Sequence, residues 1–279
     1  MNPADRDGSV WKRVIGIVGG LGPYAHVELE RLILEAASRR LGRALCDQDY
    51  PEWIVSSVPG TPDRTLALLG EVASPLPWLE RSLRRLCGTP ENPGADFAVI
   101  ACTTAHAYLE ELRRRVPLPI LDMIEESVSA AAGQLGRGGR IGVLGTTGTL
   151  RSGLYEAAVR RCSRPLAVVS LLDLEEGDRL QEELVMCPVY GALVDGRRAL
   201  EGIKSGIASR ARIEEAAKRL SRAVTLLASI GAELVISACT EIPLALPCAS
   251  VEGVPLLNPM KVAAEACVEI ALGERPLPA

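Results

Sequence analysis

Short aliphatic runs alternate with longer amphipathic segments along most of the chain. A short, continuous apolar run that is bounded by turn residues is typical of a strand buried on both faces. Runs of this kind occupy residues 14–20, 53–58, 97–102, 140–146, 166–172 and 234–239. Helix-like segments lie between or after them, at residues 25–41, 104–116, 123–135 and 213–231. Strands that alternate with helices predict an α/β fold, in which helices cover both faces of a parallel sheet.

One pattern of motifs occurs twice. Glycine-rich segments at residues 16–22 and 142–148 are each followed by strand and helix patterns, and then by a strand that ends in Cys-Thr. This repetition predicts two similar α/β domains that arose by internal duplication. We place the first domain at residues 1–125 together with 250–279, where a C-terminal helix returns to it, and the second at residues 126–249.

Composition and charge limit the kinds of molecule that the protein is expected to bind. The 279 residues are 48% hydrophobic, which is enough to fill the cores of two such domains. A net charge of -4 provides no basic surface for nucleic acid. The first residues are polar rather than signal-like, and no apolar run is long enough to cross a bilayer. We therefore expect a cytoplasmic protein that acts on a small molecule and binds neither nucleic acid nor a membrane.

The chain contains eight cysteines, none of them in a C-x-x-C motif or another paired spacing typical of metal ligands. We therefore expect no metal site. In the cytoplasm these cysteines are expected to be reduced thiols, and most of them to be small core residues.

The first glycine-rich segment reads G-x-x-G-G-x-G, which departs from the G-x-G-x-x-G of dinucleotide sites. Pro23 directly after it suits the first position of a helix. We therefore interpret the segment as a tight turn that brings backbone near Gly22 close to a substrate carboxylate.

Cys102 and Cys239 are the strongest candidates for chemistry. Each follows an apolar strand and precedes a hydroxyl residue and a predicted helix start. Ligands of parallel sheets bind at the carboxyl ends of the strands, and a helix N-terminus lowers the pKa of a nearby thiol. These placements favour two reactive thiols over two buried core thiols.

Two kinds of chemistry could use these thiols. In a Cys-His pair, His106 would serve Cys102 from one turn along the same helix, which puts the imidazole behind the helix start rather than beside a bound carbonyl. Two matched cysteines fit a different reaction better. One thiolate removes a proton from a carbon while the other thiol delivers a proton to the opposite face, which inverts the centre without a cofactor.

Five ordered motifs carry a resemblance to a known family. GIVGGLGP, TPDRT, CTTAH, GIKSG and ACTEIPL resemble the aspartate/glutamate racemase family, whose members racemise amino acids independently of pyridoxal phosphate. The resemblance runs from about residue 14 to the C-terminus. It implies two α/β domains that face each other across a cleft, one cysteine from each, and a homodimer.

The resemblance also implies roles for individual residues. Cys102 and Cys239 become the acid/base pair, and no cofactor is expected. Residues at the helix starts would hold the carboxylate and ammonium groups of the substrate, namely Thr103, Thr104, Thr240 and Glu241. Arg64 and Lys204 would be the cationic partners, and positive charge there would stabilise a carbanion next to a carboxylate.

Three positions depart from the family pattern. Thr103 stands where the family has asparagine, His26 where a small hydroxyl residue is common, and Tyr24 where a small or acidic residue is usual. These departures leave the substrate open within the class of small acidic amino acids. An isomerase or decarboxylase of a maleate-like or malonate-like dicarboxylate is the alternative enzyme, and a two-lobed amino-acid sensor is the alternative outside enzymes.

Overall fold

The computed structural model describes residues 10–195, 197–199, 201–205 and 210–278, and it divides the chain into two compact units. Unit 1 comprises Met1–Asp63, Val72–Met123 and Met260–Ala279, and unit 2 comprises Arg64–Glu71 and Ile124–Pro259. These bounds differ from the predicted ones chiefly in two places, because residues 64–71 and 250–259 fall in unit 2 rather than in the first domain.

Unit 1 is built on a four-stranded sheet in the order β2-β1-β3-β4, and every neighbouring pair in it is parallel. Its elements are β1 (Ile15–Gly19), α1 (Pro23–Leu41), η1 (Asp47–Asp49), β2 (Trp53–Ser57), α3 (Leu76–Leu86), β3 (Phe97–Ile100), the 3-10 helix η2 (Thr104–Tyr108), α4 (Leu109–Arg115), β4 (Ile120–Leu121) and α12 (Pro259–Ala271). Side chains of β3 alternate between two apolar clusters, as the two-residue period of a strand requires.

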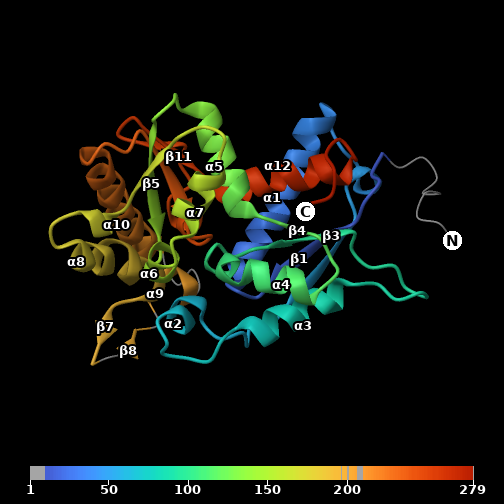
Figure 1. Cartoon of the computed structure of the whole chain (residues 1–279), viewed down its shortest axis with the longest axis horizontal. Helices are drawn as coiled ribbons and strands as arrows, with labels where there is room; N and C mark the ends of the chain where they lie inside the picture. The colour runs from blue at the N-terminus through green and yellow to red at the C-terminus, as the bar shows by residue number, and fades with distance from the viewer. Residues whose placement is uncertain (1–9, 196, 200, 206–209, 279) are drawn as a thin grey trace. The chain divides into compact units, whose positions relative to one another are not determined.

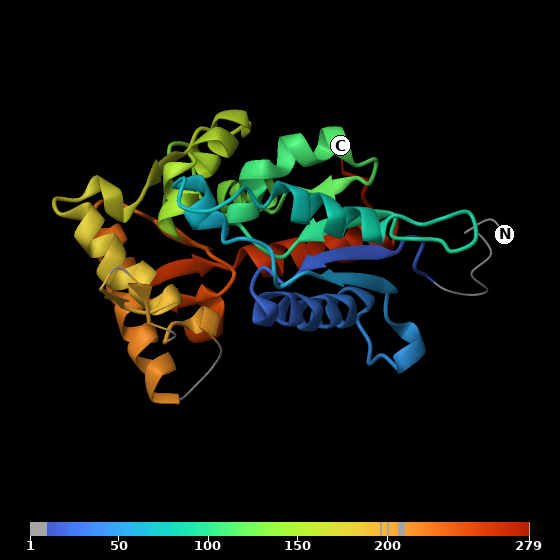
Figure 2. The same cartoon turned by 90° about the horizontal axis from the view of Figure 1, so that it is seen from below.

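Helices cover both faces of this sheet (Figure 1; Figure 2). One cluster joins Phe97 and Val99 to α1 and α12. The other joins Ala98 and Ile100 to α3 and α4, and it also includes Cys102. The fourth helix on these faces thus comes from the C-terminal end of the chain.

Unit 2 contains a five-stranded sheet in the order β10-β11-β9-β5-β6, which is parallel except for the pair β10–β11. Its strands are β5 (Arg140–Gly145), β6 (Ala167–Val169), β9 (Leu234–Ala238), β10 (Ser250–Val251) and β11 (Val254–Leu257). When the four parallel strands of each unit are taken in chain order, both sheets read second, first, third, fourth. The two units thus share one topology.

In unit 2, α10 lies on one side of the sheet and α5 and α7 on the other (Figure 1). The helices are α2 (Arg64–Leu68), α5 (Met123–Gln134), α6 (Thr147–Arg151), α7 (Leu154–Arg161), η3 (Leu171–Asp173), α8 (Gly177–Gln181), the π-helix η4 (Glu182–Met186), α9 (Cys187–Tyr190), η5 (Ile203–Ser205), α10 (Arg210–Ser229) and α11 (Ile242–Ala245). A small hairpin of β7 (Leu193–Val194) and β8 (Arg197–Arg198) follows α9. No helix within the described ranges is long and apolar enough to cross a membrane.

The predicted α/β class with parallel sheets in two domains is confirmed, and each predicted strand contains an observed one. Two segments differ in detail. Residues 104–116 form a 3-10 helix and then a short α-helix, and β6 ends at Val169 because η3 begins soon afterwards. The strands β4 and β11 were not predicted, since each is short and directly precedes a helix.

Candidate functional site

Cys102 lies two residues beyond the end of β3, in unit 1. Its side chain is only 5% exposed and belongs to the apolar cluster on the α3 and α4 face of the sheet. Because β3 is a parallel strand, this is the edge of the sheet at which ligands of α/β proteins bind. The short 3-10 helix η2 follows at once.

Thr103 and Thr104, the next two residues, are both buried. The hydroxyl of Thr103 has no hydrogen-bond partner within the parts of the chain that the structure describes. Buried hydroxyls in proteins are almost always hydrogen-bonded. A polar group of a bound molecule would satisfy Thr103.

Both ring nitrogens of His106 form hydrogen bonds with main-chain atoms. Its Nδ1 lies 3.0 Å from the carbonyl oxygen of Cys102, and its Nε2 accepts a hydrogen bond of 3.2 Å from the Met123 N–H. Because Nε2 is the acceptor, Nδ1 carries the hydrogen and donates to the carbonyl. Neither nitrogen is left to act as a base for the Cys102 thiol, which argues against a Cys-His pair here.

Cys239 directly follows β9 in unit 2, and its side chain is 4% exposed. The thiol donates a hydrogen bond of 3.1 Å to Oε2 of Glu241, and the Thr240 hydroxyl donates another of 3.1 Å to the same oxygen. Lys204 Nζ lies 3.9 Å from Oε1 of Glu241 and 4.8 Å from the ring centroid of Tyr190. The structure thus brings the buried residues Cys239, Thr240 and Glu241 together with the half-buried Lys204, a group called the Cys239 cluster below.

The prediction that the helix start lowers the pKa of the Cys239 thiol is wrong. Burial raises the pKa of the Cys239 thiol well above its usual range, and the nearby Glu241 carboxylate raises it further. Lys204 acts in the opposite direction but more weakly. The helix that follows, α11, has only four residues, so its dipole is too small to offset the loss of solvation.

Arg64 is the first residue of α2, which belongs to unit 2 although the chain enters it directly from unit 1. The side chain is buried. Thr65 donates a hydrogen bond of 3.0 Å from its hydroxyl to that of Thr146, just before α6. A β-carbon at position 148 would lie 2.7 Å from Thr65 Cα, so Gly148 permits this close approach of α2 to α6.

The first glycine-rich turn packs closely against Val58 and His26. Gly20 has a φ of 78°, and a β-carbon there would lie 2.5 Å from the Val58 amide nitrogen. The Gly20 N–H donates to Nδ1 of the buried His26 at 3.3 Å. Gly22 precedes α1 in an extended conformation. His26 therefore packs under the turn, whereas Tyr24 is 47% exposed.

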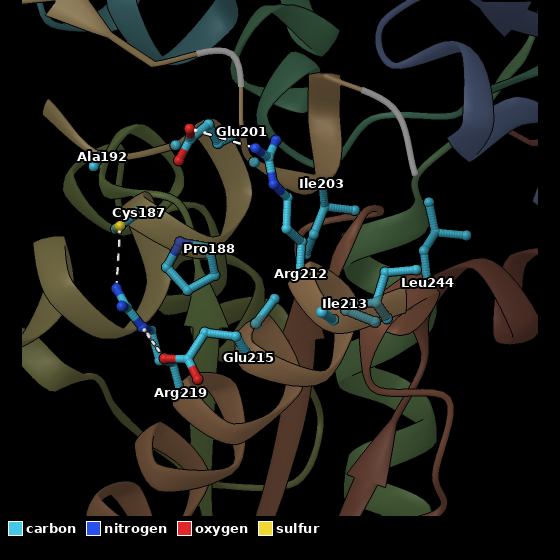
Figure 3. Close-up of a pocket in the computed structure, with 15 residues that line it drawn as sticks. Cys187, Pro188, Ala192, Glu201, Ile203, Arg212, Ile213, Glu215, Arg219 and Leu244 are labelled. Carbon is cyan, nitrogen blue, oxygen red and sulfur yellow. Dashed lines mark hydrogen bonds and ion pairs between the residues drawn. The ribbon is translucent and has the colours of Figure 1, made fainter. Parts of the chain in front are cut away.

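Unit 2 also contains a cavity of about 310 Å³ that does not include Cys239 (Figure 3). Its walls come from α9, η5, α10 and α11, and they are mostly apolar. Its two guanidinium groups are already paired, Arg212 with Glu201 at 3.5 Å and Arg219 with Glu215 at 2.9 Å. Because neither Cys102 nor Cys239 lines this cavity, the Cys239 cluster is the better candidate for the predicted thiol chemistry. Among the described residues, no group of three His, Cys, Asp or Glu side chains could hold a metal ion.

Sequence reasoning missed Tyr190, whose ring lies under the Lys204 ammonium, and the contact of Thr65 with Thr146. Tyr190 and Thr146 lie outside the motifs that carry the resemblance, whereas Thr65 is the last residue of TPDRT. Gly148 was the available signal, since a glycine within a helical segment can have a packing reason.

Comparison with known proteins gives matches over most of the chain. The sequence matches the family described as Asp/Glu/Hydantoin racemase over residues 18–165 and 157–267. It is 28% identical to the broad specificity amino-acid racemase RacX of Bacillus subtilis over 152 residues, or 53% of this chain. It is 30% identical to a glutamate racemase of Streptococcus thermophilus over 150 residues, again 53% of this chain. These matches span 60% and 45% of the two relatives, less than two thirds of either.

Solved structures share the fold over nearly the whole chain. An aspartate racemase from Picrophilus torridus superposes with a TM-score of 0.68 at 20% identity, and the match covers 94% of each chain. A glutamate racemase from Francisella tularensis gives a TM-score of 0.55 at 16% identity, covering 94% of this chain and 82% of the other. The two-unit α/β fold is therefore one that solved racemase structures also have.

Proposed function

The chain belongs to the Asp/Glu/Hydantoin racemase family, and on that premise we propose that it is a cofactor-independent racemase of a small acidic amino acid. The observation that carries the proposal is the equivalence of the two cysteines. Cys102 follows β3 and Cys239 follows β9, and these strands are third in chain order and hold the same place in sheets of the same order. Both are followed by threonine, and both are buried.

In this proposal Cys102 and Cys239 act as two bases on one α-carbon. The thiolate of one cysteine takes the α-proton, so a C–H bond breaks and an S–H bond forms. The thiol of the other cysteine then gives its proton to the opposite face of the carbanion, so an S–H bond breaks and a new C–H bond forms. Each cysteine ends in the protonation state in which the other began, and the same pair can run the reverse reaction.

The carbanion needs positive charge beside its carboxylate, because negative charge builds up there in the transition state. We assign this role to Arg64 and Lys204, two cations that lie in unit 2. Arg64 can bind a carboxylate through two parallel hydrogen bonds. Lys204 lies in the Cys239 cluster, where its Nζ is 3.9 Å from Oε1 of Glu241.

The remaining substrate contacts are assigned to small polar groups. Thr103 is supported by its buried hydroxyl without a described partner. Thr104, Thr240 and the backbone at Gly22 complete the set that the resemblance implied. One of the relatives named above is a glutamate racemase, which supports an acidic amino acid as substrate.

The test is proton NMR of the reduced enzyme in deuterium oxide with each enantiomer of aspartate and glutamate. We expect loss of the α-proton signal and accumulation of the opposite enantiomer, which chiral chromatography would identify. The blank is the double variant Cys102→Ser/Cys239→Ser. Absence of exchange with all four substrates would overturn the proposal, and turnover of maleate or a substituted malonate in the same enzyme would replace it with the dicarboxylate alternative.

A homodimer and a cytoplasmic location stay predictions. Analytical ultracentrifugation of the enzyme tests the first, and fractionation of cells that produce it tests the second.

A further inference from the structure

Glu241 is a buried carboxylate with an unusual set of neighbours. Its side chain is 3% exposed, and its Oε2 accepts hydrogen bonds from both the Cys239 thiol and the Thr240 hydroxyl, each at 3.1 Å. A carboxylate buried without partners would be costly, and these two donors stabilise it. One of them, however, is the sulfur that is to exchange a proton with the substrate.

Two charged side chains determine the electrostatics at this sulfur. Glu241 comes from the turn after β9, and Lys204 comes from η5, with its Nζ 3.9 Å from Oε1 of Glu241. Tyr190 on α9 places its ring, rather than a charge, against the Lys204 ammonium. The carboxylate therefore contacts the thiol directly through Oε2, and Lys204 lies near the other carboxylate oxygen, Oε1.

The hydrogen bond has a direction. An ionised carboxylate can only accept, so the Cys239–Glu241 contact exists only while the sulfur carries its proton. Loss of that proton would place two negative groups about 3 Å apart in a site that excludes water, which is strongly unfavourable.

We propose that Glu241 is a positioning residue that keeps the proton on the Cys239 sulfur of the substrate-free enzyme. Cys239 then enters the reaction as the proton donor for one enantiomer, and the thiolate that this turnover leaves on Cys239 is the base for the other. This inference rests on the proposed function for the role of the proton, but the geometry at Cys239 exists without a substrate. It assigns Glu241 to the thiol, whereas the family resemblance implied a contact with the substrate. Burial and the adjacent carboxylate both raise the pKa of Cys239, which agrees with this assignment.

The test is a pH titration of thiolate absorbance in the substrate-free enzyme, taken as the difference between each protein and the same protein with Cys239→Ser. Glu241→Gln keeps the shape and one acceptor oxygen but removes the charge, and we expect the Cys239 midpoint to fall by on the order of one pH unit. Lys204→Met removes the opposing cation, and we expect the midpoint to rise. Glu201→Gln, which removes an exposed carboxylate of the same unit, is the matched control and should leave the midpoint in place.

Opposite shifts in Glu241→Gln and Lys204→Met support the proposal, and an unchanged or raised midpoint in Glu241→Gln overturns it. If Glu241→Gln fails to fold, Lys204→Met decides alone, since a midpoint that does not rise contradicts the arrangement of charges. The pH profile of kcat/KM should move with the absorbance midpoint. Because the titration needs no substrate, its outcome is separate from whether the enzyme racemises an amino acid.

Discussion

Thr65 donates a hydrogen bond from its hydroxyl to the hydroxyl of Thr146, at 3.0 Å, and so ties α2 to the start of α6. Thr146 and Gly148 belong to the second glycine-rich segment, and Arg64 immediately precedes Thr65. The second glycine-rich segment thus packs against the helix that carries Arg64.

Replacement of Gly148 by alanine is expected to lower kcat/KM, because it displaces the helix that carries Arg64. The new β-carbon would lie 2.7 Å from Thr65 Cα, so α2 must shift and carry Arg64 with it. Overpacking of this kind costs about 1–3 kcal/mol. We expect kcat/KM to fall on the order of tenfold, equivalent to about 1.4 kcal/mol, with a lower melting temperature. Steady-state kinetics and thermal unfolding measure the two effects.

Gly133→Ala is the matched control for this change. Gly133 lies in α5, and a β-carbon there would meet nothing within 4 Å. Alanine favours a helix over glycine by up to about 1 kcal/mol, so this variant should be at least as stable as the wild type, with an unchanged kcat/KM. If both alanine variants behaved alike, the close approach of α2 to α6 would have no bearing on Arg64.

The membership of α2 in unit 2 shows what the sequence could not predict. Alternation of strands and helices identifies the sheets, because each strand is buried on both faces and its residues are apolar throughout. Domain bounds inferred from a linear repeat place residue 64 in the first half. Thr65 and Thr146 are far apart in the chain. The periodicity of apolar residues predicts helices and strands, but it does not predict a contact between two such distant hydroxyls.

Serine in place of either proposed catalytic cysteine, Cys102 or Cys239, should strongly slow inversion. A serine hydroxyl is far less acidic than a thiol, so it supplies neither the base nor the acid of the proposed mechanism at neutral pH. We expect Cys102→Ser and Cys239→Ser each to lower kcat for racemisation by about 10²–10⁴-fold. Exchange of the α-proton with deuterium is a separate readout, because the remaining cysteine can still remove a proton from one face.

Cys248→Ser is the control for these variants. Cys248 is exposed and belongs to unit 2, so its replacement changes the same chemical group outside the proposed site. It should keep full activity. Inversion that persisted in both Cys102→Ser and Cys239→Ser would contradict the two-base mechanism.

His106 should matter for stability and not for proton transfer. Both ring nitrogens bond to the main chain, at the Cys102 carbonyl and the Met123 N–H. In His106→Leu the buried Met123 N–H loses its acceptor, at a cost of about 1–3 kcal/mol. Denaturant unfolding should show this loss, while the pH profile of kcat/KM keeps its shape. Disappearance of a limb of that profile would instead identify His106 as a base.

The candidate site was predictable where its chemistry lies in a short motif. Cys239, Thr240 and Glu241 are consecutive, so their meeting with one another follows from the chain itself. The position of Lys204 beside them depends on η5 and on the ring of Tyr190. The direction of the effect on the Cys239 thiol could not be predicted, since it depends on burial and on how Glu241 turns.

The stability of the protein should fall with rising pH in a way that depends on Cys239. Burial, and then Glu241, raise the pKa of this thiol in the folded protein, whereas in the unfolded chain it titrates near its ordinary value of about 8.5. Between these two values the folded state keeps a proton that the unfolded state has lost. The contribution of this thiol to the free energy of unfolding is therefore fully present below about pH 8.5 and is lost as the pH rises toward the folded pKa, by up to about 1.4 kcal/mol per pH unit.

Denaturant unfolding from neutral to alkaline pH measures this effect. The free energy of unfolding should decline less steeply with pH for Cys239→Ser than for the wild type, whereas Cys248→Ser should follow the wild type. Parallel curves for all three proteins would mean that the Cys239 thiol titrates alike in both states.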